Sequence, residues 1–192
     1  MRARGLVASS EPVSTRSSAQ IAKALISPTM FGVRGLDGFG LAHALMGILA
    51  LVLGLAVIAL PKGTRRHRKI GFAYSMAMAA LNATALWIFD LTGTFGAFHV
   101  GALVSLATIA AAYLPVLYRR PRDWMVLHGT FMGWSYVGLV AAFIAEIAVR
   151  VPGVGFSAGV TMATVIAVAG GALLIHTRVP VIARRIGVSP RL

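Results

Sequence analysis

The chain has no cysteine and little charge, and both absences narrow the possible protein classes. Without cysteine there is no disulfide, no thiolate zinc site, no iron–sulfur cluster and no haem attached through cysteine. Only 12% of its 192 residues are charged, about half the share of a typical soluble domain. Hydrophobic residues make up 58% of the chain, more than one globular core would bury. The composition therefore predicts an integral membrane protein.

The charges that are present are strongly one-sided, with 18 basic and 5 acidic residues and a net charge of +13. A basic chain can bind nucleic acid, but here the basic residues stand in short clusters between long apolar runs. Clusters in such positions are a signal of membrane topology. The sequence therefore predicts a lipid bilayer as partner and no nucleic acid.

Five apolar segments are long enough to cross a bilayer, which takes about 20 residues. Turn residues separate them, and the connections are so short that consecutive helices should run antiparallel. The predicted fold class is an all-α integral membrane helical bundle with five transmembrane helices and short loops. The expected spans are residues 39–60, 70–91, 97–117, 124–149 and 155–176.

The basic residues alternate between the connections, which predicts an orientation. The first and third connections and the C-terminal tail are basic, whereas the second connection has no basic residue and the fourth has only Arg150. The positive-inside rule places the basic segments in the cytoplasm. We therefore expect a multi-pass protein with an external N-terminus and a cytoplasmic C-terminus. The basic set is Lys62, Arg65, Arg66, Arg68, Lys69, Arg119, Arg120, Arg122, Arg178, Arg184, Arg185 and Arg191.

Few ionisable side chains lie inside the expected spans, and such residues are functional candidates by default. His43, Asp90, His99 and Glu146 come from four different spans and lie roughly 26 to 31 Å above the cytoplasmic ends of those helices. Two imidazoles and two carboxylates at similar height suit a metal such as zinc, iron, manganese or copper. Alternatively, His43 and His99 are the axial ligands of a haem. A third interpretation is that the carboxylates and His99 are simply solvated at helix ends.

The other three histidines lie toward the cytoplasmic side. His128 is about one turn into the fourth span, His176 ends the fifth, and His67 stands among the basic residues of the first connection. His128 and His176 could ligate a second haem, or His176 could be a helix-end residue favoured by the helix dipole. The candidate cofactor ligands are thus His43, His99, His128 and His176. The candidate cofactor is haem b, an unidentified metal, or none.

Small residues recur at steps of four along the fifth span, at Gly159, Ala163, Ala167 and Gly171. Such a stripe lets two helix backbones approach closely in lipid. We therefore expect the fifth helix to be held by close packing.

Two short motifs resemble those of a known family. Residues 67–74 read H-R-K-I-G-F-A-Y and fit the pattern H-R-x-x-G-x-x-Y, while residues 128–136 read H-G-T-F-M-G-W-S-Y and fit H-x-x-[WF]-M-x-x-S-Y. Together with the His-x-x-x-Gly of residues 43–47, they make the chain similar to an uncharacterised family of small bacterial predicted membrane proteins, a domain of unknown function with a four-helix core. Gly133 stands where that family commonly has an arginine. The resemblance implies a helical bundle in a bacterial inner membrane and no established activity, and the architecture alone is similar to transmembrane b-type cytochromes.

These patterns divide the chain into a mostly disordered tail over residues 1–38, a four-helix membrane core over 39–150, a fifth transmembrane helix over 151–177 and a basic cytoplasmic tail over 178–192. Three functions stay open. The first is electron transfer within the membrane through histidine-ligated haem, with quinone as a possible partner. The second is a metal-dependent or proton-coupled enzyme or transporter that uses the outer histidines and carboxylates. The third is a non-catalytic subunit that packs against a partner membrane protein or forms a homo-oligomer.

Overall fold

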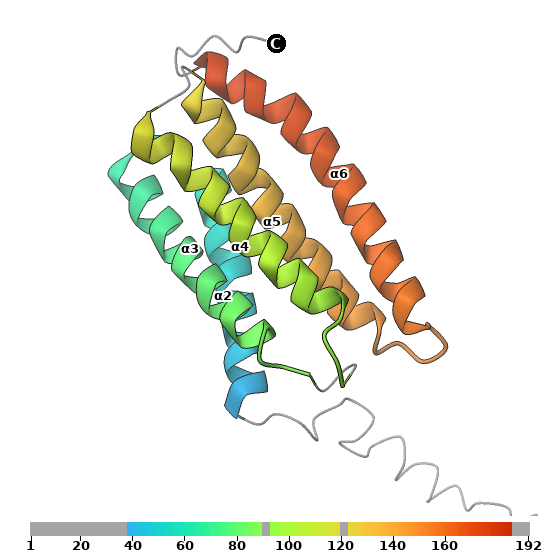
Figure 1. Ribbon diagram of the computed structural model, residues 1–192. Helices are drawn as coiled ribbons and strands as arrows, with labels where there is room; N and C mark the ends of the chain where they lie inside the picture. Colours follow the sequence, from blue (N-terminus) through green and yellow to red (C-terminus); the bar gives the residue numbers. More distant parts are fainter. Residues whose placement is uncertain (1–37, 90–92, 120–122, 186–192) are drawn as a thin grey trace, which may run out of the picture. The chain divides into compact units, whose positions relative to one another are not determined.

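The structure, a computed structural model, describes residues 38–89, 93–119 and 123–185 (Figure 1). Within these ranges the regular elements are helices and there is no strand, which confirms the all-α prediction. Except for Gly38, the tail expected to be disordered lies outside the described residues. The helices are α2 (Gly38–Ala59), α3 (Arg65–Ala85), α4 (Ala97–Tyr118), α5 (Trp124–Ala148) and α6 (Phe156–Arg185).

Four of the helices, α2, α4, α5 and α6, are long and apolar enough to cross a membrane. The 22 residues of α2 extend about 33 Å, which matches a hydrocarbon core of about 30 Å. The composition of α3 differs because its first five residues include Arg65, Arg66, Arg68 and Lys69. Its start is fixed by Thr64, whose hydroxyl accepts a hydrogen bond of 3.1 Å from the backbone N–H of residue 67. The apolar part of α3 follows this basic turn.

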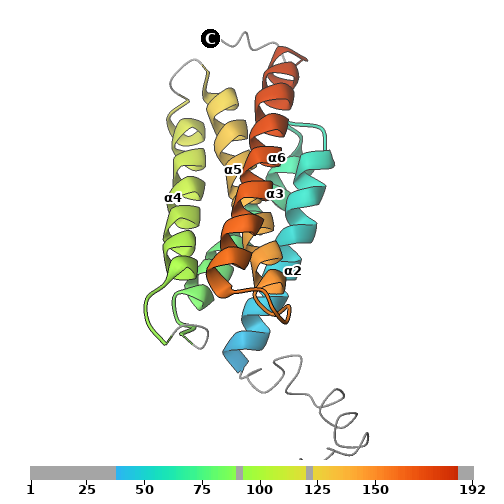
Figure 2. The same ribbon diagram turned by 90° about the vertical axis from the view of Figure 1, so that its right-hand side faces the viewer.

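The helices pack in chain order, and contacts between α2 and α5 close a four-helix group (Figures 1 and 2). α6 packs against α5 on the outside of this group. Large apolar side chains such as Val52 and Leu173 are more than 60% exposed, as suits helices that face lipid. The buried core of the four-helix group consists of Ala50, Tyr74, Ala77, Met78, Leu81, Ile109 and Leu139.

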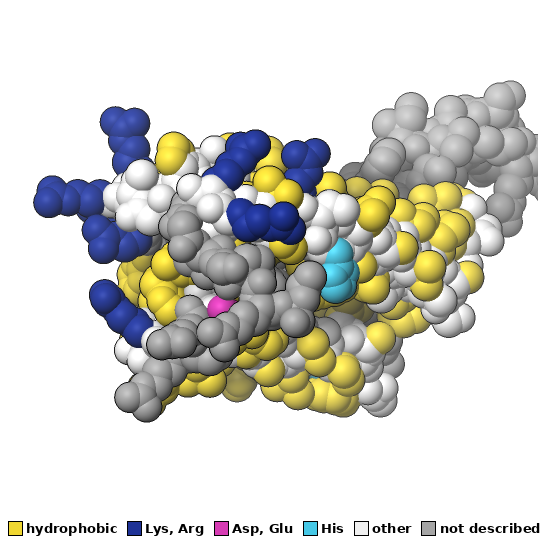
Figure 3. All heavy atoms as spheres, turned by 90° about the horizontal axis from the view of Figure 1, so that it is seen from above, with side chains coloured by type: hydrophobic (Ala, Val, Ile, Leu, Met, Phe, Trp, Pro, Cys, Tyr) yellow, Lys and Arg dark blue, Asp and Glu magenta, His cyan; other side chains and the backbone are white. Residues whose placement is uncertain are grey.

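The connections gather at two ends of the bundle. The C-terminal ends of α2, α4 and α6 and the N-terminal ends of α3 and α5 lie together, and we call this the basic end (Figure 1). Figure 3 looks onto it and shows Lys and Arg side chains around its rim. The other end, where α2 begins, is called the opposite end. Which end faces the cytoplasm stays a prediction.

The second predicted span was too long at its C-terminal side, because α3 ends at Ala85 and not at residue 91. The hydroxyl of Thr84 donates to backbone carbonyls of the preceding turn, and the N–H groups of Trp87 and Ile88 then bond to carbonyls only three residues back. Hydropathy did not reveal this end because residues 86–89 are still apolar.

The last predicted span was too short, because α6 continues to Arg185 and not to residue 176. The prediction treated residues 178–192 as a tail, yet the helix passes through Pro180. A proline removes one backbone hydrogen bond and costs about 3 kcal/mol in a helix interior. Here Ala183 beyond it is only 3% exposed, so packing of the last turns offsets that loss. At 30 residues, α6 is about 45 Å long and exceeds a hydrocarbon core by several turns.

Candidate functional site

His43 is the ionisable residue of α2, and it bonds to α3 near the opposite end. Its Nδ1 atom lies 2.9 Å from the hydroxyl of Thr84. That hydroxyl also lies 3.1 and 2.8 Å from the carbonyls of Ala80 and Leu81, and when its one hydrogen is donated to either carbonyl it accepts from His43. In that arrangement the Nδ1 atom of His43 carries the hydrogen, and Nε2 of the neutral ring, which has no hydrogen-bond partner among the described residues, can take a proton or bind a metal.

Glu146 on α5 is the acidic residue whose charge acts on His43. It interacts electrostatically with His43 and forms an ion pair with Arg150 one turn later on the same helix. Asp90, the second predicted carboxylate, lies outside the described residues. In the part of the chain that the structure describes, no group of three His, Asp or Glu side chains is placed to hold a metal ion. The metal site of His43, Asp90, His99 and Glu146 stays a prediction.

His99 is built into the start of α4. Its Nδ1 atom accepts a hydrogen bond of 3.2 Å from the backbone N–H of Gly96, and its ring lies 4.5 and 5.0 Å from the ring centres of Phe89 and Phe95. The neutral ring therefore carries its hydrogen on Nε2, which is buried without a partner among the described residues. A histidine that ligates iron through Nε2 needs the reverse arrangement, with its hydrogen on Nδ1. To ligate iron through Nε2, His99 would have to give up the bond from Gly96, and its role as a haem ligand stays a prediction.

His128 on α5 anchors the polar contacts of the basic end. Its Nδ1–H donates to the backbone carbonyl of Ala112 at 3.0 Å, and its ring meets the edge of the Tyr113 ring at 6.5 Å between centres. Tyr113 in turn donates to the hydroxyl of Ser75 on α3 at 2.9 Å, and Ser75 donates to the carbonyl of Gly71. His128 therefore resembles His43: Nδ1 faces an acceptor, and no hydrogen-bond partner of Nε2 is found in the described part of the chain.

His67 and Lys62 adjoin His128 at this end, outside the apolar part of α3. Burial lowers the pKa of the half-buried His67 imidazole, and the nearby charges of Lys62 and His128 lower it further. Burial also lowers the pKa of the Lys62 ammonium, which donates to the carbonyls of Val57 and Ile58 at the end of α2. The Nδ1 atom of His67 is buried without a hydrogen-bond partner in the described residues. The basic end thus contains two neighbouring histidines.

Tyrosine and serine side chains continue this cluster into the middle of the bundle. The hydroxyls of Tyr74 on α3 and Ser135 on α5 lie 2.9 Å apart, and Tyr136 donates to the carbonyl of Leu51 on α2 at 3.3 Å. The two tyrosine rings fit because residue 54 is glycine, whose missing side chain would overlap the Tyr136 ring. Tyr74 and Ser135 are 3% and 2% exposed, so this hydrogen bond joins α3 and α5 in the interior.

From the tyrosine and serine cluster toward the opposite end, the interior of the bundle first becomes apolar. One further polar contact lies between this apolar layer and His43. Asn82 of α3 donates to the hydroxyl of Ser105 of α4 at 3.0 Å. Between Ser75 and Asn82, about 10 Å along α3, the buried side chains of this helix are apolar. The apolar layer consists of Ala50, Ala77, Met78, Leu81, Ile109 and Leu139.

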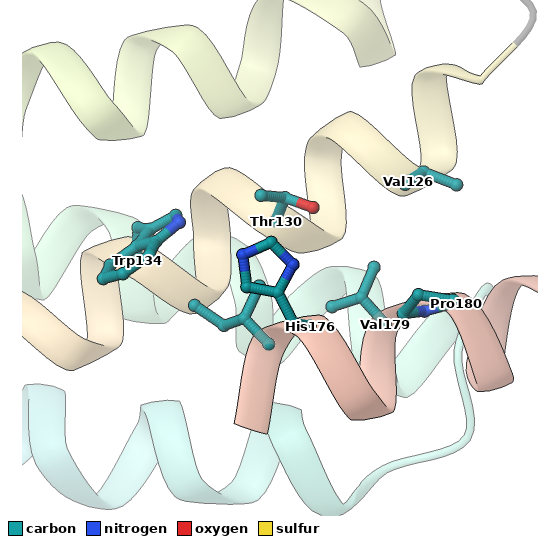
Figure 4. Close-up of a pocket in the computed structure, with 7 residues that line it drawn as sticks. Val126, Thr130, Trp134, His176, Val179 and Pro180 are labelled. Atoms are coloured by element: carbon teal, nitrogen blue, oxygen red, sulfur yellow. The ribbon is translucent and has the colours of Figure 1, made fainter. Parts of the chain in front are cut away.

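His176 lies apart from His128, on the other side of α5 (Figure 4). It lines a pocket between α5 and α6 together with Val126, Thr130 and Trp134. These three α5 residues follow each other at steps of four, whereas His128 lies two residues from two of them and faces α4. The structure does not bring His128 and His176 together as ligands of one haem.

The sequence analysis did not single out Tyr74 or Tyr113, yet both form hydrogen bonds inside the bundle. A signal was present, because His67, Gly71, Tyr74 and Asn82 recur at steps of three, four and eight and share one face of the helix.

The two motifs noted in the sequence face each other in the structure. Tyr74 ends the first motif and Ser135 belongs to the second, and their hydroxyls are hydrogen-bonded. The histidines that begin the two motifs, His67 and His128, interact electrostatically. Residues 40–182 match the family described as "Predicted membrane protein (DUF2306)". The chain belongs to this family.

Membership of the DUF2306 family confirms the predicted membrane class and supplies no activity. The match continues beyond residue 150, the end of the predicted four-helix core, and includes nearly all of α6. No curated protein and no solved structure matches the chain.

Proposed function

We propose that this DUF2306 protein is a proton-coupled membrane protein in which His128 and His43 carry protons at the two ends of the bundle. One observation carries the proposal: both imidazoles place Nδ1 against an acceptor on a neighbouring helix, and no hydrogen-bond partner of Nε2 is found among the described residues. Histidine is the side chain whose usual pKa lies near physiological pH, so a ring held in this way can bind and release a proton at Nε2.

The side chains at the basic end provide a route by which a proton would enter the bundle. His67 is close to water and to His128, and its lowered pKa makes it release a proton readily at neutral pH. From His128 the hydroxyls of Tyr113 and Ser75 offer the next acceptors. A hydroxyl passes a proton on by accepting one at its lone pair and releasing its own.

The apolar layer explains how such a path would avoid a continuous leak. Met78 in this layer is 1% exposed, and the buried side chains of α3 between Ser75 and Asn82 are apolar, so this stretch offers a proton no polar group. A proton can cross only when α3 shifts against its neighbours or when water enters transiently. Coupling of transport to such a movement is the property that a proton-driven carrier needs.

The proposal is tested by proton flux in liposomes that contain the purified protein, a trapped pH-sensitive dye and a potassium gradient with valinomycin. The wild type is expected to acidify or alkalise the lumen faster than protein-free liposomes. His128→Gln and His43→Gln should lose most of that flux, because glutamine cannot cycle a proton. His176→Gln is the matched control, since His176 is exposed and lies on the far side of α5, and it should keep the flux.

Two outcomes would reject the proposal. If all three variants and the wild type carry the same flux as empty liposomes, the histidines do not conduct. If the purified protein is red, with a Soret band that shifts on addition of dithionite, the competing function of haem-based electron transfer is favoured instead.

A further inference from the structure

A pocket between α5 and α6 is lined by residues that take no part in the proposed proton path. Its volume is about 180 Å³, and Val126, Ile175, Val179 and Pro180 form its apolar walls (Figure 4). The remaining lining residues are Thr130, Trp134 and His176. In Figure 4 the imidazole of His176 lies between Trp134 and Val179 and beside Thr130. Polar groups thus share the pocket with four apolar side chains.

All three polar residues of the pocket can donate a hydrogen bond. Among the described residues, the Thr130 hydroxyl, the Trp134 indole N–H and the His176 ring have no hydrogen-bond partner. Donors without partners are costly at membrane depth because lipid tails offer no acceptor. An acceptor from outside the chain would remove that cost.

The size and charge of the pocket restrict what that acceptor can be. A cavity of about 150 Å³ holds a benzene-sized ring, so 180 Å³ is enough for one substituted six-membered ring. No Lys, Arg, Asp or Glu lines the pocket. A phosphate would find no cationic partner there, whereas a neutral ring with carbonyl oxygens would match the three donors. The Trp134 indole offers such a ring an aromatic neighbour.

The depth of the pocket fits a ligand that reaches it from the bilayer. Thr130 and Trp134 lie about 9 and 15 Å along α5 from its start at the basic end. A headgroup at this depth lies below the lipid headgroups, and an attached apolar tail can continue between lipid chains.

We propose that this pocket binds the headgroup of an isoprenoid quinone, with the donors of Thr130, Trp134 and His176 directed at its carbonyl oxygens. The site involves binding only, and it is independent of the proton path because it lies on the other side of α5. Trp134 provides a direct readout, because a quinone that contacts an indole quenches its fluorescence.

The test uses a variant in which Trp134 is the sole tryptophan, made by Trp87→Phe and Trp124→Phe, in phosphatidylcholine nanodiscs titrated with decylubiquinone. Quenching is expected to saturate with added quinone. His176→Leu in the same background should weaken the apparent affinity about tenfold, the loss that corresponds to one hydrogen bond. Thr130→Val, which keeps the side-chain shape, should weaken it as well. Melting temperatures establish that the variants are folded.

A second reporter separates binding from random collisions in the membrane. In the second variant Trp87 is the sole tryptophan. Trp87 is 75% exposed and follows the end of α3, whereas the pocket lies between α5 and α6, so quenching should rise linearly without saturation. Equal, linear quenching of both reporters, or no effect of His176→Leu, would overturn the proposal. Displacement of the quinone by added phosphatidylglycerol at constant total lipid would also overturn it and would assign the pocket to a phospholipid headgroup.

Discussion

The contact between α5 and α6 and the interior of the α2–α5 group are held together by different means. α6 presents Gly159, Ala163, Ala167 and Gly171, all buried, to α5, and Gly133 of α5 meets Ile175 of α6 in the same way. The four-helix interior instead contains tyrosine, serine, asparagine and histidine side chains that bond across helices.

This difference marks the α5–α6 contact as structural and the interior of the α2–α5 group as a candidate functional region. In lipid, close backbone approach and interhelical hydrogen bonds can each hold helices together, so polar groups are not required for stability alone. Their concentration inside the α2–α5 group, next to the imidazoles of His43 and His128, is therefore the feature that needs a functional explanation. The following substitutions test that contrast, beginning with the largest expected effect.

Gly171→Leu should have the largest effect on stability. A side chain at residue 171 would overlap Val137 of α5, so α6 would have to move away, at a cost on the order of 3 kcal/mol. Unfolding by a rising fraction of denaturing detergent, followed by circular dichroism, measures the loss. Gly170→Leu is the matched control, because nothing lies within 4 Å of a side chain there. Equal stability of both variants would contradict close packing of α6.

Tyr74→Phe should cost less, about 1 kcal/mol, because it removes one interhelical hydrogen bond and leaves the ring in place. Combination with Ser135→Ala in a double-mutant cycle isolates that bond, and the two effects should not add. Tyr118→Phe, at a residue 71% exposed, is expected to leave stability unchanged. Fully additive effects would show that the two hydroxyls do not interact.

Acidification should destabilise the protein through His67. Burial first, and then Lys62 and His128, hold its pKa below the ordinary value of 6.5, so the unfolded chain takes up the proton before the folded one does. The stability due to the neutral ring is complete above pH 6.5 and is lost as the pH falls through the lowered folded pKa. His67→Gln should flatten the dependence of the melting temperature on pH below 6.5, while His176→Gln should retain it. An unchanged slope in His67→Gln would locate the effect elsewhere.

Glu146→Gln should have the smallest effect, about 0.3 kcal/mol, because its ion pair with Arg150 is partly exposed and both residues lie on one helix. Raised salt should shrink even this difference. A loss of more than about 1 kcal/mol would instead indicate that Glu146 has a stronger partner, and would direct attention to His43 and the predicted metal site.

Much of the fold could be predicted because lipid imposes simple rules on sequence. The starts of α4 and α5 were predicted at Ala97 and Trp124, where the structure has them, since turn residues and apolar length suffice to define a span. The ends of α3 and α6 were wrong because hydrogen bonds of Thr84 and packing beyond Pro180 decide them, and hydropathy reports neither.

The candidate site was less accessible to prediction. His43 and His128 were singled out from their positions within spans, but their pairing with other histidines rested on depth alone. Depth along a helix says nothing of the direction in which a side chain points, and the structure turns His128 toward α4 while His176 faces the opposite side of α5.

The sequence by itself determined the membrane class, the approximate positions of the helices in the described ranges, the short antiparallel connections and the family, because all of these follow from local composition and from contiguous motifs. Only the tertiary structure decided which polar residues meet. The bond between Tyr74 and Ser135 joins residues 61 positions apart, and that between His43 and Thr84 joins residues 41 apart. Such contacts depend on how each helix is rotated about its axis, which is set by packing against all its neighbours at once.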